Sequence, residues 1–333
     1  MVNNVALIVD TSFLVHRQLA MPNVASLRTK NGTRTGGVFG TLRSLSATVK
    51  DINDLGMVVC CFDSYPAYRK FIYPNYKANR KSNPDSPEYI EYITKDQFGW
   101  STEDMNTFTY DTLKELLPKM KVKTIYQENV EGDDAVFQSA KYLSSKGYKC
   151  IVMSDDRDFL QIVNEVPNCE VYRVMAKETI TKDNLRENQG VAPEWYIIFK
   201  AMCGDNSDGI PGVASGFGQG AITQLINEAE SRGYDPDDPE TLNKLVDLAQ
   251  NWTDKGKARI QKFDNSAKEQ LELNLKIMDF RKCPYSDAAL EELKSKLDEH
   301  LEFDNMYLLQ KFKEYEFSSL GNILTDIHFR KLS

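Results

Sequence analysis

The stretch VEGDD, residues 130–134, places the carboxylates of Glu131, Asp133 and Asp134 within four positions, directly before an apolar-periodic run over 135–143. Like charges this close repel one another strongly unless solvent or a bound cation screens them. Acids near a helix start are common because the helix dipole stabilises negative charge there. Three acids within four positions are more than this effect explains. We therefore interpret the stretch as part of a divalent-metal site at a helix start.

Further aspartates follow predicted strand ends or lie in turns: Asp10, Asp63, Asp156, Asp158, Asp205 and Asp208. The runs VALIVD (5–10) and MVVCCFD (57–63) are apolar and end in Asp, which is typical of buried parallel strands followed by a site. Parallel strands end at one shared edge of the sheet, where α/β proteins bind their ligands, so these acids should converge. A single Asp could equally cap the following helix; the repetition indicates a site.

Apolar strand patterns alternate with helical patterns up to about residue 184, and beyond about 185 only helical, charged patterns follow. Besides 5–10 and 57–63, strands are expected over 121–130, 148–154 and 169–174. The alternation predicts an α/β fold with a mostly parallel central sheet covered by helices. We expect an α/β domain over 1–184, with a basic region at about 64–105, and a helical domain over 185–333.

The charge is divided unevenly along the chain, although the total is −8. Residues 1–84 carry eleven Lys and Arg against four Asp and Glu, whereas the rest of the chain is acidic. Such an asymmetry indicates a basic surface beside an acidic site.

There is no apolar run of membrane-spanning length and no CxxC pair, so we expect a cytosolic protein with reduced thiols and no contact with a membrane.

Residues 65–81 (YPAYRKFIYPNYKANRK) contain no acid and interleave five basic side chains with five aromatic ones. Basic groups bind phosphates and aromatic rings stack on splayed bases, so the stretch favours nucleic-acid binding. A solvated basic loop with buried aromatic rings is the alternative.

A second element, over 201–226, has the pattern of a helix, a glycine-rich turn and another helix. Such a turn presents backbone N–H groups and a helix N-terminus to a phosphate without reading sequence.

None of the three histidines, His16, His300 and His328, lies near the acid clusters, so a Ser-His-Asp or Cys-His mechanism lacks its base. Ligation by carboxylates alone favours hard cations such as Mg²⁺ or Mn²⁺ over zinc. Phosphoryl chemistry follows from these two observations.

The ordered motifs resemble the 5′-nuclease family, which includes flap endonucleases and the 5′-to-3′ exonuclease domains of bacterial polymerases. The resemblance covers about residues 5–226. Its acids match at Asp10, Asp63, EGDD (Glu131, Asp133, Asp134), SDDRDFLQIV (Asp156, Asp158) and GDNSDGIPG (Asp205, Asp208). NGTRTGGVFG is similar to the family's Gly-Thr-Gly segment, and YKANR (76–80) to its basic arch entrance. Within this family, we expect a stand-alone nuclease of the tailed-phage kind, which includes the T-even ribonuclease H type.

This resemblance implies a PIN-like 5′-nuclease fold with a helix-hairpin-helix DNA-binding motif, its glycine-rich hairpin over 204–226. It also implies two Mg²⁺ ions, for which Mn²⁺ substitutes. The first ion would be held by Asp10, Asp63, Glu131, Asp133 and Asp156, and the second by Asp134, Asp158, Asp205 and Asp208. Lys77 and Arg80 would neutralise charge on the scissile phosphate.

Nucleic-acid contacts are expected from the NGTRTGGVFG segment, the basic stretch and the hairpin: Arg34, Arg69, Lys70, Tyr76, Lys81, Gly212, Gly216 and Gly218. The resemblance further implies K⁺ at the hairpin. Gly220 and Ala221 stand where family members carry Lys and Thr, which weakens the hairpin's expected grip on phosphate.

The expected activity is structure-specific 5′-nuclease cleavage of DNA or RNA·DNA, either exonuclease or flap endonuclease, as in primer removal during replication. We expect a monomer in the cytoplasm, that of the host if phage-encoded, with a single-stranded-DNA-binding protein or sliding clamp as partners. Two alternatives stay open at this point: a PIN-type metal-dependent ribonuclease, and a non-catalytic paralogue that binds DNA junctions.

Overall fold

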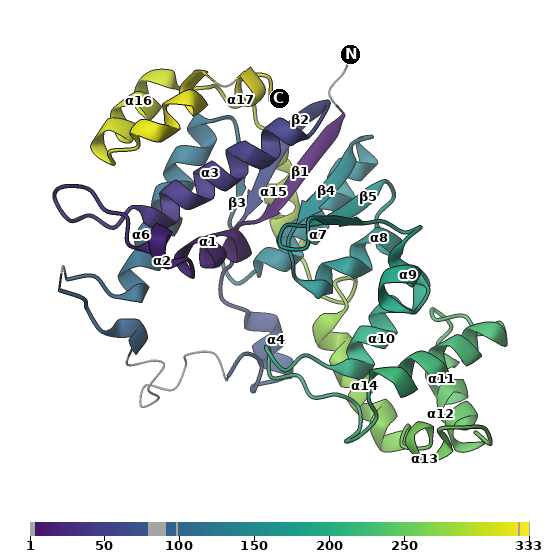
Figure 1. Ribbon diagram of the computed structural model, residues 1–333. Helices are drawn as coiled ribbons and strands as arrows, with labels where there is room; N and C mark the ends of the chain where they lie inside the picture. Colours follow the sequence, from purple (N-terminus) through teal and green to yellow (C-terminus); the bar gives the residue numbers. More distant parts are fainter. Residues whose placement is uncertain (1–3, 79–90, 98, 326, 333) are drawn as a thin grey trace.

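A six-stranded sheet in the order β3-β2-β1-β4-β5-β6 forms the centre of the computed structural model, which describes residues 4–78, 91–97, 99–325 and 327–332 (Figure 1). Its strands are β1 (Val5–Asp10), β2 (Leu55–Cys61), β3 (Lys123–Ile125), β4 (Lys149–Met153), β5 (Cys169–Arg173) and β6 (Glu178–Ile180). All neighbours pair in parallel except β6, which runs antiparallel to β5. The predicted mostly parallel sheet is confirmed, and β6 was not predicted.

The helices before residue 190 surround this sheet. They are α1 (Thr11–Leu19), α2 (Pro22–Ala25), α3 (Gly36–Asp51), α4 (Ala67–Ile72), α6 (Thr102–Lys119), α7 (Gly132–Ser145), η1 (Arg157–Gln161), α8 (Ile162–Glu165) and α9 (Leu185–Gln189). Strand residues alternate between two cores: Ala6 and Ile8 face one core, whereas Leu7 and Val9 face the other. This alternation follows from the strand period of two, and it explains why the strands read as continuous apolar runs.

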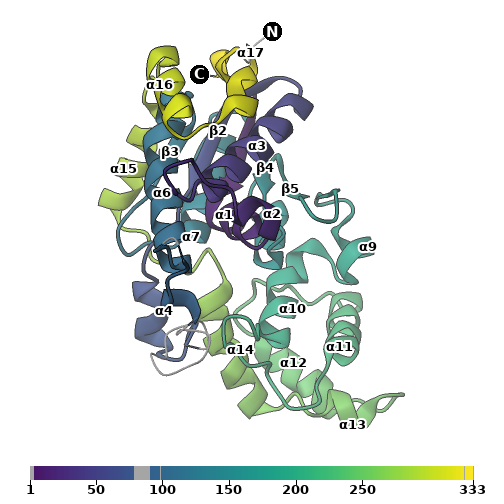
Figure 2. The same ribbon diagram turned by 60° about the vertical axis from the view of Figure 1, so that its left-hand side comes forward.

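The helices after residue 190 form most of the molecule outside the sheet and the helices that surround it. They are η2 (Pro193–Trp195), α10 (Tyr196–Cys203), α11 (Gln219–Ser231), α12 (Thr241–Gln250), α13 (Lys257–Ile260), α14 (Asn265–Met278), α15 (Asp287–Asp298), α16 (Asn305–Glu314), η3 (Ser318–Thr325) and α17 (Ile327–Arg330). We call residues 185–284 the helical lobe, which projects from one end of the sheet (Figures 1 and 2). None of the described helices is long and apolar enough to cross a membrane.

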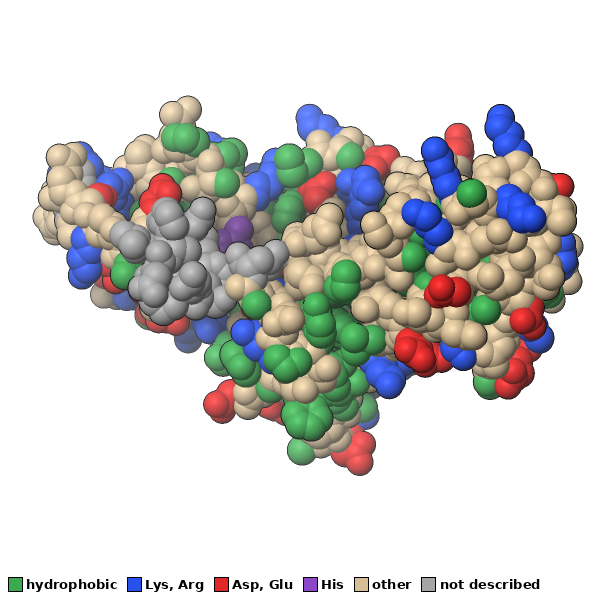
Figure 3. Space-filling model, turned by 90° about the horizontal axis from the view of Figure 1, so that it is seen from below, with side chains coloured by type: hydrophobic (Ala, Val, Ile, Leu, Met, Phe, Trp, Pro, Cys, Tyr) green, Lys and Arg blue, Asp and Glu red, His purple; other side chains and the backbone are tan. Residues whose placement is uncertain are grey.

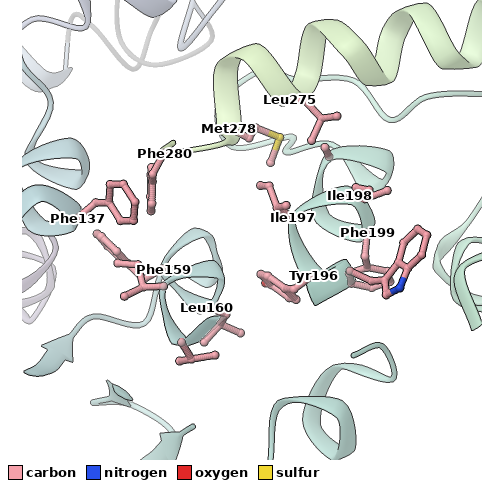
Figure 4. Close-up of a cluster of buried hydrophobic side chains, with 14 of the residues drawn as sticks. Phe137, Phe159, Leu160, Tyr196, Ile197, Ile198, Phe199, Leu275, Met278 and Phe280 are labelled. Atoms are coloured by element: carbon pink, nitrogen blue, oxygen red, sulfur yellow. The ribbon is translucent and has the colours of Figure 1, made fainter. Parts of the chain in front are cut away.

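Aromatic packing joins the helical lobe to the sheet domain (Figure 4). The ring of Phe280, which follows α14, lies 5.7 Å between centroids from both Phe137 on α7 and Phe159 on η1. Buried Gln161 donates its amide to the Met278 carbonyl at 3.0 Å and accepts the Phe280 N–H at 3.0 Å. The C-terminal end of α14 is therefore fixed directly beside η1.

The predicted helical domain over 185–333 is wrong in its last part. Helix α15 packs on α7 and β3, while α16, η3 and α17 return to pack on α3 and α6, at the opposite face of the sheet from α7 (Figure 2). Leu308 and Phe312 of α16 are buried in the same core as Val9 of β1. An amphipathic helix shows in its sequence that it has a buried face, but not which core buries it.

This arrangement predicts that Phe312→Ala destabilises the sheet domain, since removing a buried Phe costs about 3–5 kcal/mol. Met306, on the same helix, is 74% exposed, whereas Phe312 is 4% exposed. Met306→Ala is therefore the matched control and should change the free energy of unfolding by less than about 0.5 kcal/mol. Chemical denaturation of both variants measures the difference, and similar stabilities would contradict the placement of α16.

Candidate metal centre

The acids of the first two strands lie at the C-terminal edge of the sheet, as predicted. Asp10 is the last residue of β1 and caps α1, its Oδ1 accepting the Phe13 N–H at 3.0 Å. Its Oδ2 accepts a bond from Ser154 Oγ at 2.9 Å, just after β4. Asp63 stands two residues beyond β2 and accepts the N–H of Gly132 at 2.7 Å. Asp10 therefore caps α1 and also lies among the acids at the edge of the sheet.

Position 132, in the EGDD segment, is a glycine because a side chain there would clash with Asp63. A Cβ at Gly132 would lie 2.8 Å from Asp63 Oδ1, closer than carbon and oxygen can approach. The absence of a side chain lets the start of α7 contact Asp63 directly, and Asp133 then lies in the first turn of that helix. The EGDD stretch therefore joins the acids of β2 to those of α7.

Arg69 of α4 is buried beneath the acids and does not face solvent. Its guanidinium binds both oxygens of Asp134, at 2.6 and 2.8 Å, and Glu131 Oε2 at 2.5 Å. Its Nε–H donates to the Ile277 carbonyl at the end of α14 at 2.9 Å. Paired, bidentate bonds of this kind are what a buried carboxylate needs. Arg69 is 4% exposed and is therefore not positioned to contact nucleic acid, contrary to the prediction. Both oxygens of Asp134 bind Arg69, and its role as a metal ligand stays a prediction.

Tyr76 and Lys77 tie the segment after α4 to the turn that begins the hairpin. The Tyr76 hydroxyl lies 3.2 Å from Glu131 Oε1 and 3.1 Å from Asp208 Oδ2. Lys77 Nζ forms an ion pair with Glu131, and its backbone N–H donates to the Asp208 carbonyl at 2.8 Å. Tyr76 is 3% exposed, so the prediction that it contacts nucleic acid is wrong as well.

Burial lowers the pKa of Lys77, but Glu131, Asp133 and Asp208 raise it by more, so that Lys77 stays charged. Its ammonium therefore acts as an internal cation among the acids, in the place where the sequence predicts a phosphate-neutralising group. Its backbone φ of 55° lies in the left-handed region that a lysine rarely adopts, and the bond to Asp208 holds it there.

Lys200 of α10 forms a second internal cation. Its Nζ lies 2.8 Å from Asp158 Oδ1 and 2.7 Å from Asp205 Oδ2. Although burial raises the pKa of Asp205, its bonds to Lys200 and Ser207 lower it below the usual value. The sequence analysis missed Lys200, yet a signal was present: it is the one charged residue in the apolar run YIIFKAM, five positions before Asp205.

The electrostatics show an excess of negative charge at the sheet edge. Burial, followed by repulsion from Asp63, raises the pKa of Asp10 to about 7. Burial and the neighbouring carboxylate of Asp156 raise the pKa of Asp158 to about 7. The pKa of Asp133 is also raised well above its usual value, first by burial and then by Asp63 and Asp10. Acids that repel one another this strongly are suited to hold a cation.

The donor set fits hard divalent cations, since it consists of carboxylates from β1, the β2 end, α7, η1 and the hairpin turn. In the described part of the chain, however, no group of three or more His, Cys, Asp or Glu side chains has the spacing of a formed metal site. Lys77 and Lys200 instead bridge pairs of acids. The residues fit the ions chemically, and two ammonium groups supply positive charge among them.

The remaining predicted residues lie as follows. Arg34 pairs with Asp96 and donates to the Ser26 carbonyl, and Lys70 stacks on the Tyr65 ring at 5.5 Å. Gly212 packs against the end of α10, whereas Gly218 is the N-cap of α11 and Gly216 lies two residues before it, beside Lys262. Arg80 and Lys81 lie outside the described residues. Asp155, next to the predicted ligand Asp156, accepts the Met175 N–H at 2.9 Å and supports the turn between β5 and β6.

The parallel sheet, the acids at its C-terminal edge and the neighbouring helix-hairpin-helix together define the architecture of a 5′-nuclease. A family model described as the 5′-3′ exonuclease N-terminal resolvase-like domain matches residues 5–190. The chain belongs to this 5′-3′ exonuclease family.

Curated relatives agree with this assignment. A 5′-3′ exonuclease of Aquifex aeolicus is 27% identical over 315 residues, which cover 94% of this chain and 92% of that protein. A 5′-3′ exonuclease of Buchnera aphidicola is 27% identical over 212 residues, which cover 63% of this chain and 66% of that protein. The matched segment of the Buchnera protein thus leaves about a third of its length outside the comparison.

Solved structures of the T5 D15 protein share the fold. One, crystallised with metal ions, has a TM-score of 0.58 at 18% identity and covers 96% of this chain and 98% of its own. Another is a D15 flap endonuclease variant in a pseudo-enzyme-product complex with DNA and metal ions, with a TM-score of 0.58 at 17% identity. At this identity the likeness establishes the architecture.

We predict that Lys200→Met destabilises the metal-free protein by about 1–3 kcal/mol, because it leaves Asp158 and Asp205 without their cation in a partly buried place. Mg²⁺ should restore much of the lost thermal stability, since a divalent ion can replace the ammonium. Lys182→Met is the control, as Lys182 pairs with Glu194 at the surface. Thermal unfolding of both variants with and without Mg²⁺ measures this, and a Lys200→Met variant as stable as the unmodified protein would contradict it.

The raised pKa values predict how stability depends on pH without metal. Asp10 and Asp158 take up protons more readily folded than unfolded, so their contribution to stability is full below about pH 4 and is lost as the pH rises through about 7. The melting temperature in chelator should fall by roughly 3 °C or more between pH 5 and pH 8. Mg²⁺ should raise it more at pH 8 than at pH 5. An equal effect of Mg²⁺ at both pH values would argue against a cation at these acids.

Proposed function

We propose that this protein is a structure-specific 5′-nuclease, which hydrolyses phosphodiesters at the 5′ ends and flaps of DNA or RNA·DNA and removes primers during replication. The observation that carries the proposal is the meeting of three elements in one place. The acids at the sheet edge, the base of the basic stretch at Tyr76 and Lys77, and the hairpin turn at Asp208 are bonded to one another.

Two divalent ions, Mg²⁺ or Mn²⁺, would serve as Lewis acids here and lower the pKa of an attacking water. We assign the first ion to Asp10, Asp63, Asp133 and Asp156, with Glu131 beside them. The second would be held by Asp158, Asp205 and Asp208. We assign Asp134 to Arg69, which binds both of its oxygens, and to neither ion directly.

The protein's own groups have separate tasks in this proposal. Arg69 and Tyr76 hold Glu131 in place, and Ser154 and the cap of α1 orient Asp10. Lys77 carries a positive charge that an entering phosphate can use in exchange for Glu131. Arg80 is proposed for the same role on the strength of the resemblance. These groups position charge before the substrate arrives, so little reorganisation is needed during the reaction.

The two alternatives are less well supported. A PIN-type ribonuclease would share the sheet and several acids, but would not be expected to have the glycine-rich hairpin bonded to the basic stretch. A non-catalytic paralogue would have lost some of the acids, and every expected acid is present in the chain. The partners, the K⁺ at the hairpin, the monomeric state and the cytoplasmic location stay predictions. At the hairpin, Lys262 Nζ already donates to the Ser215 carbonyl at 2.7 Å.

Asp133→Asn should separate binding from catalysis. The change removes one negative charge and one metal ligand at constant size, so cleavage of a 5′-flap DNA in Mg²⁺ should fall by roughly 100-fold or more. In chelator the same variant should bind the flap at least as tightly as the unmodified protein, because repulsion of the phosphate backbone is reduced. Filter binding in chelator and single-turnover cleavage in Mg²⁺ measure the two effects.

Asp155→Asn provides the control, since it removes an equal charge from an acid that bonds the Met175 N–H. It should leave cleavage within a few-fold of the unmodified rate. If Asp133→Asn cleaved at a near-normal rate, or if the unmodified protein cleaved fully in excess chelator, the proposed metal centre would be incorrect.

A further inference from the structure

The hairpin and the start of α11 carry no charge of their own. Residues 209–226 contain no Lys, Arg, Asp or Glu, and Gly220 and Ala221 stand at the positions where the resemblance leads one to expect Lys and Thr. The N-terminus of α11 still presents unbonded N–H groups, as the first turn of any helix does. A phosphate-binding hairpin of this kind therefore needs positive charge from elsewhere.

That charge is supplied by the segment between α12 and α14. Residues 253–262 (TDKGKARIQK) contain four basic side chains and one acid, within a part of the chain that is acidic as a whole. Lys255, Lys257 and Arg259 line the same hollow as Gly218 and Gly220, and its volume is about 780 Å³. We call this hollow the basic groove. Figure 3 shows Lys and Arg side chains standing out at this end of the molecule.

The segment is firmly placed beside the hairpin. Phe263 is fully buried and stacks on Phe217 of the hairpin, with ring centroids 5.9 Å apart and an interplanar angle of 24°. Gln250 and Gln261 exchange side-chain to backbone bonds of 2.9 and 2.8 Å, which close the loop between α12 and α13. The groove is thus built from two segments that the fold holds together.

Lys262 connects the two segments directly. Its Nζ donates to the Ser215 carbonyl at 2.7 Å, above Gly216, whose φ of 73° lies in the left-handed region. A Cβ at Gly216 would lie 2.5 Å from this ammonium, so a side chain there would displace it. Lys262 therefore braces the hairpin, and the other three cations are left to face the groove.

Lys255, Lys257 and Arg259 form no ion pair with an acid in the described part of the chain, unlike most basic residues elsewhere in the helical lobe. Three unpaired cations beside a helix N-terminus are an electrostatic site for several phosphates in a row. We infer that the basic groove binds the phosphate backbone of the duplex part of the substrate, and that Lys255, Lys257 and Arg259 take over the role of the missing hairpin lysine. The inference rests on the proposed function only for the nature of the substrate.

The test is the salt dependence of binding to a 5′-flap duplex, measured in chelator so that cleavage plays no part. The triple variant K255A/K257A/R259A should bind the duplex at least 10-fold more weakly at low salt. Removing one cation that neutralises a phosphate lowers the slope of log K against log salt by about 0.9, so the slope should fall by about 2–3. Binding to a single strand of equal length should change much less.

The matched control is K182A/R186A/R232A, which removes the same charge from Arg186 and Arg232 of the helical lobe and from Lys182 just before it. These residues pair with Glu230, Glu228 and Glu194. This control should keep the affinity of the unmodified protein, and its slope should stay within about 0.5 of the unmodified value. If the two triple variants lost affinity equally, the effect would be one of net charge and the assignment of the groove would be overturned.

A variant that adds a positive charge tests the inference even if the triple variant does not fold. A Cβ at Gly220 would meet no atom within 4 Å, so Gly220→Lys should fold normally and add a cation to the groove. It should bind the duplex more tightly and steepen the salt slope by about 0.9, whereas Gly220→Gln should not. Equal slopes for these two variants would overturn the inference.

These outcomes can be told apart from a failure of the proposed function. If the unmodified protein cleaved no substrate with a 5′ end in Mg²⁺, the proposed function would fail, while the binding slopes in chelator would still decide the role of the groove. If it cleaved normally and the slopes were insensitive to Lys255, Lys257 and Arg259, the inference alone would fail.

Discussion

The balance of charge at the C-terminal edge of the sheet is the constraint on which the rest of the structure depends. Parallel strands and the EGDD turn bring carboxylates so close that burial and mutual repulsion raise the pKa values of Asp10 and Asp158 to about 7. Three basic residues, Arg69, Lys77 and Lys200, each bind two of the neighbouring acids. Removing one member of a buried set of this kind costs more than the set contributes as a whole, because the partner is left uncompensated.

The same bonds hold separate parts of the chain together. Arg69 comes from α4, Lys77 from the segment after it and Lys200 from α10, so each cation joins the acids to a different element. Tyr73 adds a bond from its hydroxyl to the Gly209 carbonyl at 3.2 Å. The position of the basic stretch relative to the hairpin is thus set by the acids themselves. Replacement of an ammonium by a metal ion or a phosphate would alter the bonds between these elements as well as the charge.

The parallel sheet and the acids at its edge were largely predictable from the sequence, because buried parallel strands leave continuous apolar runs and the acids follow the ends of these runs. Asp10, Asp63 and the EGDD segment were placed correctly on that basis. The rest depended on facts that spacing does not contain. The alternation of basic and aromatic residues could not show that Arg69 and Tyr76 point inward, and three residues were too few to reveal β6. The amphipathic pattern of α16 could not say which core it joins.

Helix α14 gives the molecule a fixed length scale. It begins just after the segment that lines the basic groove, and it ends where Arg69 and Gln161 hold the carbonyls of Ile277 and Met278, beside the acids. Its 14 residues, at 1.5 Å each, span about 21 Å. A nucleic-acid strand advances about 3.4 Å per nucleotide, so the helix corresponds to about six nucleotides. If the proposed function and the inference about the groove hold, this helix would set the distance between the bound duplex and the acids, and one added turn, about 5.4 Å, would lengthen that distance by between one and two nucleotides.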